Sequence, residues 1–231
     1  MTIDKELDII LCQTCINTYK GNHGTVKDTL KNSKFIDNGD VEFIIGELDD
    51  KLVVAFQGSN GTDDWIHNLT FLKEKASYGE VHSGFLKQFR SVKKRLIEEI
   101  LKYERKHELI FTGHSLGAAL AILSAYFLPE IPALSQNYIF PICVTFGSPR
   151  VGTADFTKEF IERVLYCNNY INGADTVCKV PPVWLFYRHV PRVIKINQKM
   201  TWKEKLAFIP RWITGNPYDH EPERYLIGVK K

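Results

Sequence analysis

The chain has 231 residues, of which 44% are hydrophobic, 12% aromatic and 25% charged. This composition is that of a folded globular protein, and it excludes a chain that is disordered over most of its length. The net charge of +3 is unevenly placed, because residues 188–231 carry ten Lys and Arg against four Asp and Glu. A basic tract of this kind is either a solvated face or a contact with an anionic surface.

The first residues, MTIDKELDIILCQTC, include early acidic side chains and lack a basic stretch followed by an apolar one. They predict no signal peptide, and no run of about 18 apolar residues predicts a membrane span. The five cysteines are odd in number and scattered, which favours reduced thiols. Together these features predict a cytoplasmic location, with peripheral contact to membranes left open. Cys12-x-x-Cys15 lacks a second pair, so we expect no metal site and no cofactor.

Apolar periodicity predicts the elements in chain order. They are an antiparallel hairpin (41–45 and 52–56), an amphipathic helix (85–103), a buried strand (109–112), a buried helix (116–128), a strand (140–146), a helix (153–165) and two strands (183–189 and 193–196). Buried strands that alternate with helices indicate a mostly parallel sheet covered on both faces. We therefore expect a single α/β domain over residues 1–231.

The sharpest motif is Gly113-His114-Ser115-Leu116-Gly117, which lies between a predicted strand and a predicted helix. This is the context of a nucleophile elbow, in which a serine stands on a strained turn with its hydroxyl accessible. The flanking glycines leave room for the strand and the helix to approach each other. The N–H of Leu116 then points from a helix N-terminus toward a developing oxyanion. Ser115 is therefore the predicted nucleophile.

A nucleophilic serine needs a base, and the base needs a carboxylate that orients it. In elbow folds these follow the serine in the order carboxylate, then histidine. Only His189 and His220 follow Ser115, and His189 lies in an apolar run, where a histidine is more often a core residue. His220 lies in a polar loop, and Asp175 lies on a predicted loop after a strand. These positions favour Asp175 and His220.

Seven blocks in chain order resemble those of one known family. They are 53–59 (VVAFQGS), 64–69 (DWIHNL), 81–85 (VHSGF), 113–120 (GHSLGAAL), 146–152 (FGSPRVG), 172–182 (NGADTVCKVPP) and His220-x-x-Glu223-x-Tyr225. These blocks are similar to those of the class 3 lipases, the fungal-type lipases and their plant and intracellular relatives. The resemblance covers roughly residues 40–226. Single blocks are weakly specific, whereas seven in order are strongly so.

The resemblance implies an α/β-hydrolase fold with a catalytic triad of Ser115, Asp175 and His220. Ser115 would attack an ester carbonyl, His220 would move the proton, and Asp175 would hold the imidazole. The backbone N–H groups of Ser59 and Leu116 would bind the oxyanion.

Three positions depart from the family pattern: Gln57 stands for the usual Arg, Ser59 for the commoner Thr and Asn68 for an Asp. The backbone donor survives these changes, but anchoring of the oxyanion loop by an arginine does not carry over. Tyr187-x-His189 resembles a second, noncatalytic histidine of the family, which strengthens the choice of His220 as the base.

Two segments bear on substrate access. In this family residues 59–80 often form a lid, and Trp65, Ile66 and Leu69 suit a flap over an acyl groove, although a fixed surface loop fits as well. Residues 201–215 (TWKEKLAFIPRWITG) combine aromatic and basic side chains, as a lipid-interface segment would, or pack ordinarily.

The leading functional hypothesis is a serine esterase or lipase that hydrolyses acylglycerol-type lipid esters. A phospholipase, an acyltransferase or an esterase of small soluble esters would use the same triad, and a catalytically inactive lipid-binding module is a third reading. The expected partner is a lipid ester substrate, with possible contact to a membrane or lipid-droplet surface. The basic residues form no nucleic-acid-binding motif.

Overall fold

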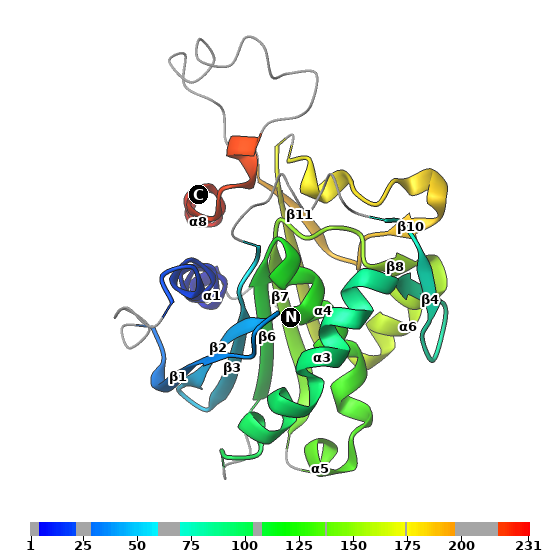
Figure 1. Ribbon diagram of the computed structural model, residues 1–231. Helices are drawn as coiled ribbons and strands as arrows, with labels where there is room; N and C mark the ends of the chain where they lie inside the picture. The colour runs from blue at the N-terminus through cyan, green and yellow to red at the C-terminus, as the bar shows by residue number, and fades with distance from the viewer. Residues whose placement is uncertain are drawn as a thin grey trace.

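The computed structural model describes residues 5–21, 29–59, 70–103, 108–136, 138–173, 175–196 and 217–231 (Figure 1). Its centre is a seven-stranded sheet in the order β1-β2-β3-β6-β7-β9-β11. The strands are β1 (Lys31–Asp37), β2 (Glu42–Leu48), β3 (Lys51–Phe56), β6 (Glu108–His114), β7 (Ile139–Phe146), β9 (Tyr166–Asn172) and β11 (Val193–Ile196).

The sheet is mostly parallel, as predicted. β1, β2 and β3 pair antiparallel, which confirms the predicted hairpin, and the strands from β3 to β11 are parallel to one another. The register sets Phe56 opposite Gly113 and His114 opposite Phe146. Because the parallel strands end at one edge, residues that follow β6 and β9 meet there.

Helices cover both faces of the sheet (Figure 1). On one face lie α1 (Lys5–Thr18) and α8 (Pro222–Lys230), and on the other lie α3 (Ser83–Ile100), α4 (Leu116–Phe127) and α6 (Ala154–Arg163). Short helices α5 (Pro132–Ser135) and Leu128–Glu130 follow α4. α3 is amphipathic and α4 is buried on nearly every side, which confirms both predicted helix types.

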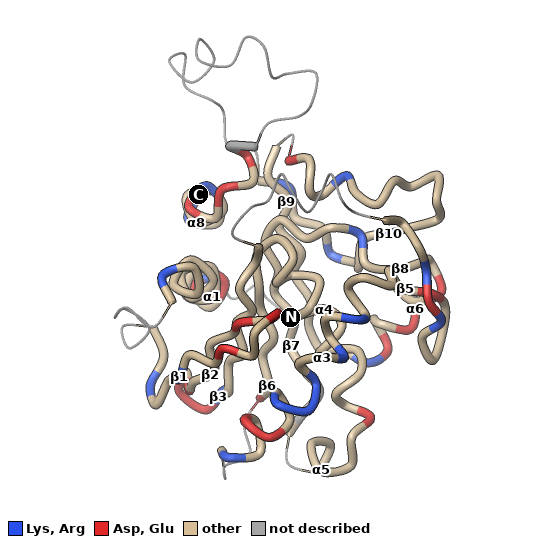
Figure 2. Tube along the Cα trace, viewed as in Figure 1, with Lys and Arg blue, Asp and Glu red and all other residues tan. Residues whose placement is uncertain are grey.

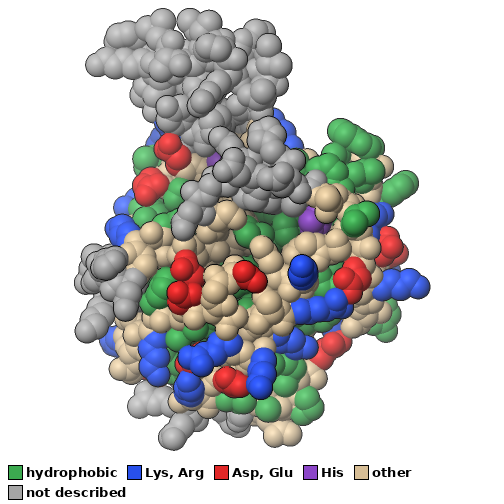
Figure 3. Space-filling view, in the orientation of Figure 1, with side chains coloured by type: hydrophobic (Ala, Val, Ile, Leu, Met, Phe, Trp, Pro, Cys, Tyr) green, Lys and Arg blue, Asp and Glu red, His purple; other side chains and the backbone are tan. Residues whose placement is uncertain are grey.

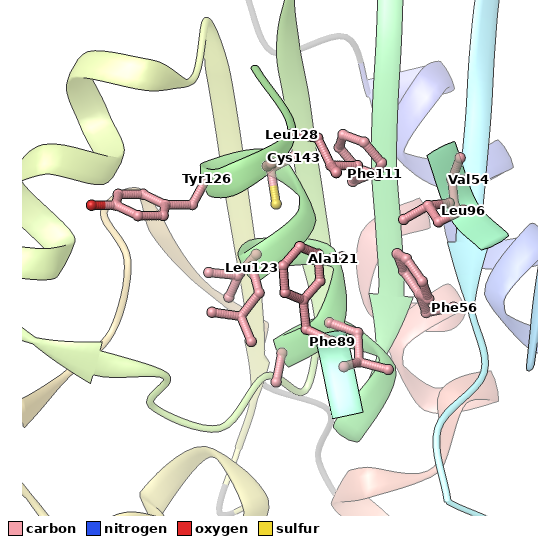
Figure 4. Packing of buried hydrophobic residues seen from close by; sticks show 14 of the residues in the cluster. Val54, Phe56, Phe89, Leu96, Phe111, Ala121, Leu123, Tyr126, Leu128 and Cys143 are labelled. Carbon is pink, nitrogen blue, oxygen red and sulfur yellow. The ribbon is translucent and has the colours of Figure 1, made fainter. Parts of the chain in front are cut away.

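The two-residue period of the strands builds two hydrophobic cores. Val54, Phe56 and Phe111 face the α3 and α4 side, whereas Val53, Ala55 and Ile110 face the α1 and α8 side. Figure 4 shows part of the first core, to which the sheet contributes Phe56 and Phe111, α3 contributes Phe89 and α4 contributes Ala121 and Leu123.

A small antiparallel sheet in the order β10-β8-β5-β4 flanks the main one. Its strands are β4 (Lys73–Lys75), β5 (Glu80–His82), β8 (Gly152–Thr153) and β10 (Tyr187–Arg188). The prediction of a strand over 183–189 is wrong, because Val183–Leu185 is a 3-10 helix and only Tyr187–Arg188 pairs, with β8. Trp184 and Phe186 of this apolar run face outward. An apolar run alone does not show which side chains are buried.

Charged residues lie on the outer elements, and the middle of β6 and β7 carries none (Figure 2). Among the described helices, none combines the length and the apolar character that a bilayer span requires. The proposed lid residues Trp65, Ile66 and Leu69 lie outside the described residues, and so does the 201–215 segment.

Candidate active site

The turn between β6 and α4 carries Ser115 in a strained conformation, with φ +59° and ψ −126°. Non-glycine residues pay roughly 1–3 kcal/mol for such a backbone. The flanking glycines are sterically required, because a Cβ on Gly113 would lie 2.3 Å from the Gly117 carbonyl group, and one on Gly117 would lie 2.3 Å from the Phe56 oxygen. The structure therefore has the strand–serine–helix geometry that the motif predicts.

Asp175 and His220 come together from two distant loops. Asp175 follows β9, and His220 ends the 3-10 helix Pro217–His220 just before α8. The Asp175 Oδ2 atom lies 2.7 Å from Nδ1 of His220, and both side chains are buried. The other carboxylate oxygen, Oδ1, accepts the N–H of Val177 at 2.8 Å.

Tyr225, on α8, donates its hydroxyl to Asp175 Oδ2 at 2.5 Å. Burial by itself raises the pKa of Asp175, but the attraction and hydrogen bonds from His220 and Tyr225 outweigh it and hold that pKa below its usual value. Asp175 is therefore an ionised carboxylate near neutral pH, as required of a group that orients an imidazole.

A second buried histidine links the elbow to the His220 loop. His114 has Nε2 2.7 Å from the backbone oxygen of His220 and Nδ1 2.8 Å from the Tyr19 hydroxyl. Because a carbonyl only accepts, Nε2 carries the proton and the tyrosine donates to Nδ1. The rings of His114 and His220 are in contact, with centroids 4.5 Å apart and ring planes tilted by 34°. The hydrogen bond from His114, whose ring is itself held by Tyr19, thus keeps the backbone of His220 close to the Ser115 turn.

Ser115 Oγ and His220 Nε2 are both buried, and neither has a hydrogen-bond partner among the described residues. The bond between them is therefore not made in this structure, although the Asp175–His220 half of the arrangement is. In enzymes without bound substrate this bond is often long and tightens on binding.

A cavity of about 230 Å³ is lined by both predicted oxyanion residues, Ser59 and Leu116. The first N–H groups of α4 have no acceptor within their own helix, so that of Leu116 is available to an anion. Gln57, which replaces the family's arginine, has its backbone N–H bonded to the Glu42 oxygen at 3.0 Å. The loop is thus tied to β2 through its main chain.

His189 has both ring nitrogens engaged. Nε2 lies 2.8 Å from the Cys178 oxygen, so it donates, and Nδ1 lies 3.4 Å from the Asn169 amide nitrogen, so it accepts. Burial lowers the pKa of His189 to about 4. A histidine held in this way has no free nitrogen for a serine proton.

Sequence reasoning missed the supporting residues Tyr19, His114 and Tyr225. Tyr225 had a usable signal, because it ends the His-x-x-Glu-x-Tyr block three residues into α8. His114 stands inside the elbow motif, but nothing local indicates that its ring contacts Tyr19, just after α1, and the His220 loop. The described residues hold no group of three or more His, Cys, Asp or Glu side chains that suits a metal ion.

Buried neutral histidines predict acid sensitivity. Burial lowers the pKa of His82 and His189 to about 4, and that of His114 well below 6.5. An unfolded chain binds a proton at each near pH 6.5, so stability present above that pH is lost as pH falls toward 4. We expect urea denaturation to show about 3–5 kcal/mol less stability at pH 5 than at pH 7.

The variant His82→Asn separates this effect from general acid denaturation. His82 caps α3 by accepting the Phe85 N–H, and asparagine can replace that acceptor without titrating. Its loss of stability between pH 7 and pH 5 should be smaller by about 1–2 kcal/mol. An identical pH dependence in the two proteins would contradict the assignment.

Comparison with known proteins identifies the fold and the family of this chain. The chain aligns with the solved triacylglyceride lipase of Rhizomucor miehei at a TM-score of 0.71 and 22% identity, covering 95% of this chain and 94% of that one. The architecture is therefore the α/β-hydrolase fold. The family model "Lipase (class 3)" matches residues 53–184, more than half of the chain. The chain belongs to the class 3 lipase family.

Curated relatives include the lipase of Rhizomucor miehei, 30% identical over 151 residues (62% of this chain and 41% of that protein). A secreted mono- and diacylglycerol lipase of Fusarium solani is 31% identical over 147 residues (60% and 42%), and a chloroplastic phospholipase A1 of Arabidopsis thaliana is 29% identical over 184 residues (70% and 38%). The chain spans about two-fifths of the length of these relatives.

The predicted cytoplasmic location is wrong by this comparison, since several of the matched relatives are named as secreted or chloroplastic proteins. The prediction rested on the first residues of the sequence. Because the chain spans only about two-fifths of the length of its relatives, its first residues are not a basis for predicting its cellular location.

Proposed function

We propose that the protein is a serine hydrolase that cleaves carboxylic esters of lipids through an acyl-enzyme on Ser115. The observation that carries this proposal is the buried Asp175–His220 pair at 2.7 Å, at the sheet edge where the strained Ser115 turn ends β6. Family membership supports the same reaction class.

In the proposed mechanism His220 Nε2 takes the Ser115 proton as Oγ attacks the ester carbonyl. The imidazolium then gives that proton to the leaving alcohol, and a water molecule repeats the sequence to release the acid. Asp175 keeps the proton of Nδ1 in place and stabilises the positive ring. The Tyr225 hydroxyl and the Val177 N–H hold the carboxylate in that orientation.

The proposed oxyanion donors are the N–H groups of Ser59 and Leu116, which line one cavity. Donors fixed on a loop and at a helix N-terminus need no reorganisation when charge develops on the carbonyl oxygen. Replacement of the family's arginine by Gln57 leaves both of these backbone donors in place.

The proposed substrates are acylglycerols, because relatives carry the names lipase and mono- and diacylglycerol lipase. Phospholipids are the second candidate, because several plant relatives are named phospholipase A1. Such substrates gather in membranes or droplets, so contact with a lipid surface is part of the proposal. Hydrolysis of monoacylglycerol, triacylglycerol and phosphatidylcholine, measured side by side by fatty-acid release, distinguishes them.

A fluorophosphonate probe tests the nucleophile directly, since it reacts with activated serines. We expect covalent labelling that mass spectrometry places on Ser115. A folded protein that stays unlabelled would favour the inactive lipid-binding module instead.

Mutation should distinguish the proposed base, His220, from the structural His189. His220→Ala removes the proposed base and should lower kcat for a soluble ester by roughly 10³-fold or more in a folded protein. His189→Ala removes two structural hydrogen bonds, so it should lower Tm while kcat of the folded fraction changes by less than about tenfold. Loss of turnover in His189→Ala but not in His220→Ala would reverse the assignment.

A further inference from the structure

The segment that follows cis-Pro181 carries an exposed apolar surface. Trp184 is 75% exposed and Phe186 68%, and Val183 is about half exposed. Leu72, whose backbone oxygen accepts the Tyr187 hydroxyl at 3.2 Å, is 66% exposed. We call these four residues the Trp184 ridge. Figure 3 shows hydrophobic side chains projecting at the upper right, where Figure 1 places β10 and the segment before it. Large apolar residues grouped at one surface mark an interaction site more often than single ones do.

The ridge is held in one conformation. Arg188 donates to the Val183 oxygen at 3.0 Å, and Arg150 donates to the backbone oxygens of Lys179 and Pro181. Phe186 has φ +65°, a left-handed backbone that is unfavourable for a bulky residue. Burial of the ring does not offset this strain, because the ring faces outward. Two arginine side chains and a strained backbone at Phe186 therefore hold this segment in a conformation that exposes its apolar side chains.

Cations surround the ridge. Lys73, Lys75 and Arg188 line a groove of about 600 Å³ together with Phe186, and the exposed Lys179 precedes the ridge in the chain. The Lys73 ammonium lies 5.5 Å from the centre of the Phe186 ring. The carboxylates of the same groove are Glu80, which pairs with Lys73, and Asp155. The groove thus holds three cations against two carboxylates, and with the exposed Lys179 the positive charge complements a surface of anionic groups.

The ridge also lies on the side of the molecule that carries the site. The same loop that places Asp175 after β9 continues into the ridge, and Figure 1 shows this loop on the upper edge with the 3-10 helix that ends at His220. A flat surface that contacts the ridge would therefore face the edge at which the parallel strands end.

We propose that the Trp184 ridge docks the protein on the surface of a bilayer that contains anionic lipid. Indole and phenyl rings enter the region between head groups and acyl chains, and the lysines contact the head groups. The inference rests on the proposed lipid-ester hydrolysis, because docking at this edge brings the site to substrate in the bilayer. It assigns the aromatic part of the docking surface to Trp184 and Phe186, which lie outside both the 59–80 segment and the 201–215 segment, whereas Leu72, Lys73 and Lys75 belong to the 59–80 segment.

Vesicle co-sedimentation tests the ridge. All proteins carry Ser115→Ala so that the lipid stays intact, and vesicles are phosphatidylcholine alone or with phosphatidylglycerol. Trp184→Ser with Phe186→Asn removes both rings, and asparagine tolerates the left-handed backbone. We expect at least a tenfold weaker partition onto the mixed vesicles. Leu101→Asn with Leu165→Asn is the matched control, because both leucines are exposed and lie away from the ridge, and it should bind as the parent does.

A charge-reversal arm tests the anionic preference. Lys75→Glu with Lys179→Glu should weaken binding to the mixed vesicles severalfold more than Lys31→Glu with Lys34→Glu, which changes the net charge equally at exposed positions of β1. Equal binding of the ridge variant and the parent would overturn the proposal. So would a parent that shows no vesicle binding, or one whose ridge mediates self-association in light scattering instead.

Turnover of a soluble ester by the Ser115 enzyme keeps the two proposals apart. The ridge variant should keep kcat/KM for that ester within about twofold, because it leaves the site unchanged. If no protein hydrolyses any ester while binding still depends on the ridge, the proposed function fails and the docking surface stands.

Discussion

Ser115→Ala is expected to lower kcat/KM for a soluble ester by roughly 10⁴-fold or more while the protein stays folded. The hydroxyl is the only proposed atom that bonds to the acyl group, and the oxyanion donors that remain act on an attack by water that is far slower. Initial rates on a p-nitrophenyl ester, with the fluorophosphonate label as a second readout, measure the loss. A variant with parental turnover would exclude Ser115 as the nucleophile.

The same variant should be as stable as the parent or slightly more stable. Ser115 Oγ is buried without a partner in the described structure, and an unsatisfied buried hydroxyl costs about 1–3 kcal/mol. Alanine keeps the Cβ, so the strain at φ +59° is unchanged. A Tm that falls by several degrees would show that the activity loss includes unfolding, and the kinetic result would then need to be read from the folded fraction.

Asp175→Asn has the second largest expected effect, a fall in kcat of roughly 10³–10⁴-fold. The carboxylate accepts from His220, Tyr225 and the Val177 N–H, and an amide cannot replace its charge or all of its acceptor sites. The imidazole then loses the group that fixes its tautomer. Because the pKa of Asp175 lies below its usual value, the carboxylate is charged across neutral pH, and the defect should persist at every pH from about 6 to 9.

Tyr225→Phe is the graded comparison for Asp175→Asn. It removes one donor to the carboxylate and keeps the ring that packs against His114 and Phe146. We expect a kcat loss of about tenfold, well below that of Asp175→Asn, because the charge and the His220 bond remain. If Asp175→Asn, folded by circular dichroism, lost less activity than Tyr225→Phe, the proposed role of Asp175 would be wrong.

Much of the fold followed from local pattern. The pattern of hydrophobic residues predicted five features that the structure has: the hairpin, the amphipathic α3, the apolar α4 and the buried strands β6 and β7. Residues 183–189 were predicted wrongly as a strand, because hydrophobicity was taken as burial. A strand before Asp175 was expected but not located, because the polar sequence of β9, YCNNYIN, has no apolar pattern that marks its bounds. The N-terminal α1 was not predicted, because its burial depends on partners far away in the chain.

The sequence by itself determined the chemistry that is available: an elbow serine, an aspartate after a strand, a histidine in a polar loop, and the order in which they follow. The sequence can predict these residues because the turn, the strand end and the loop are each recognised from a few neighbouring residues. Only the tertiary structure decided which groups touch. It placed His220 rather than His189 on Asp175, brought Tyr225 and His114 in support, and turned Trp184 and Phe186 outward. The contacts of Asp175 with His220 and Tyr225 and of His114 with His220 join residues 45 to 106 positions apart, and no periodic pattern encodes a distance of that kind.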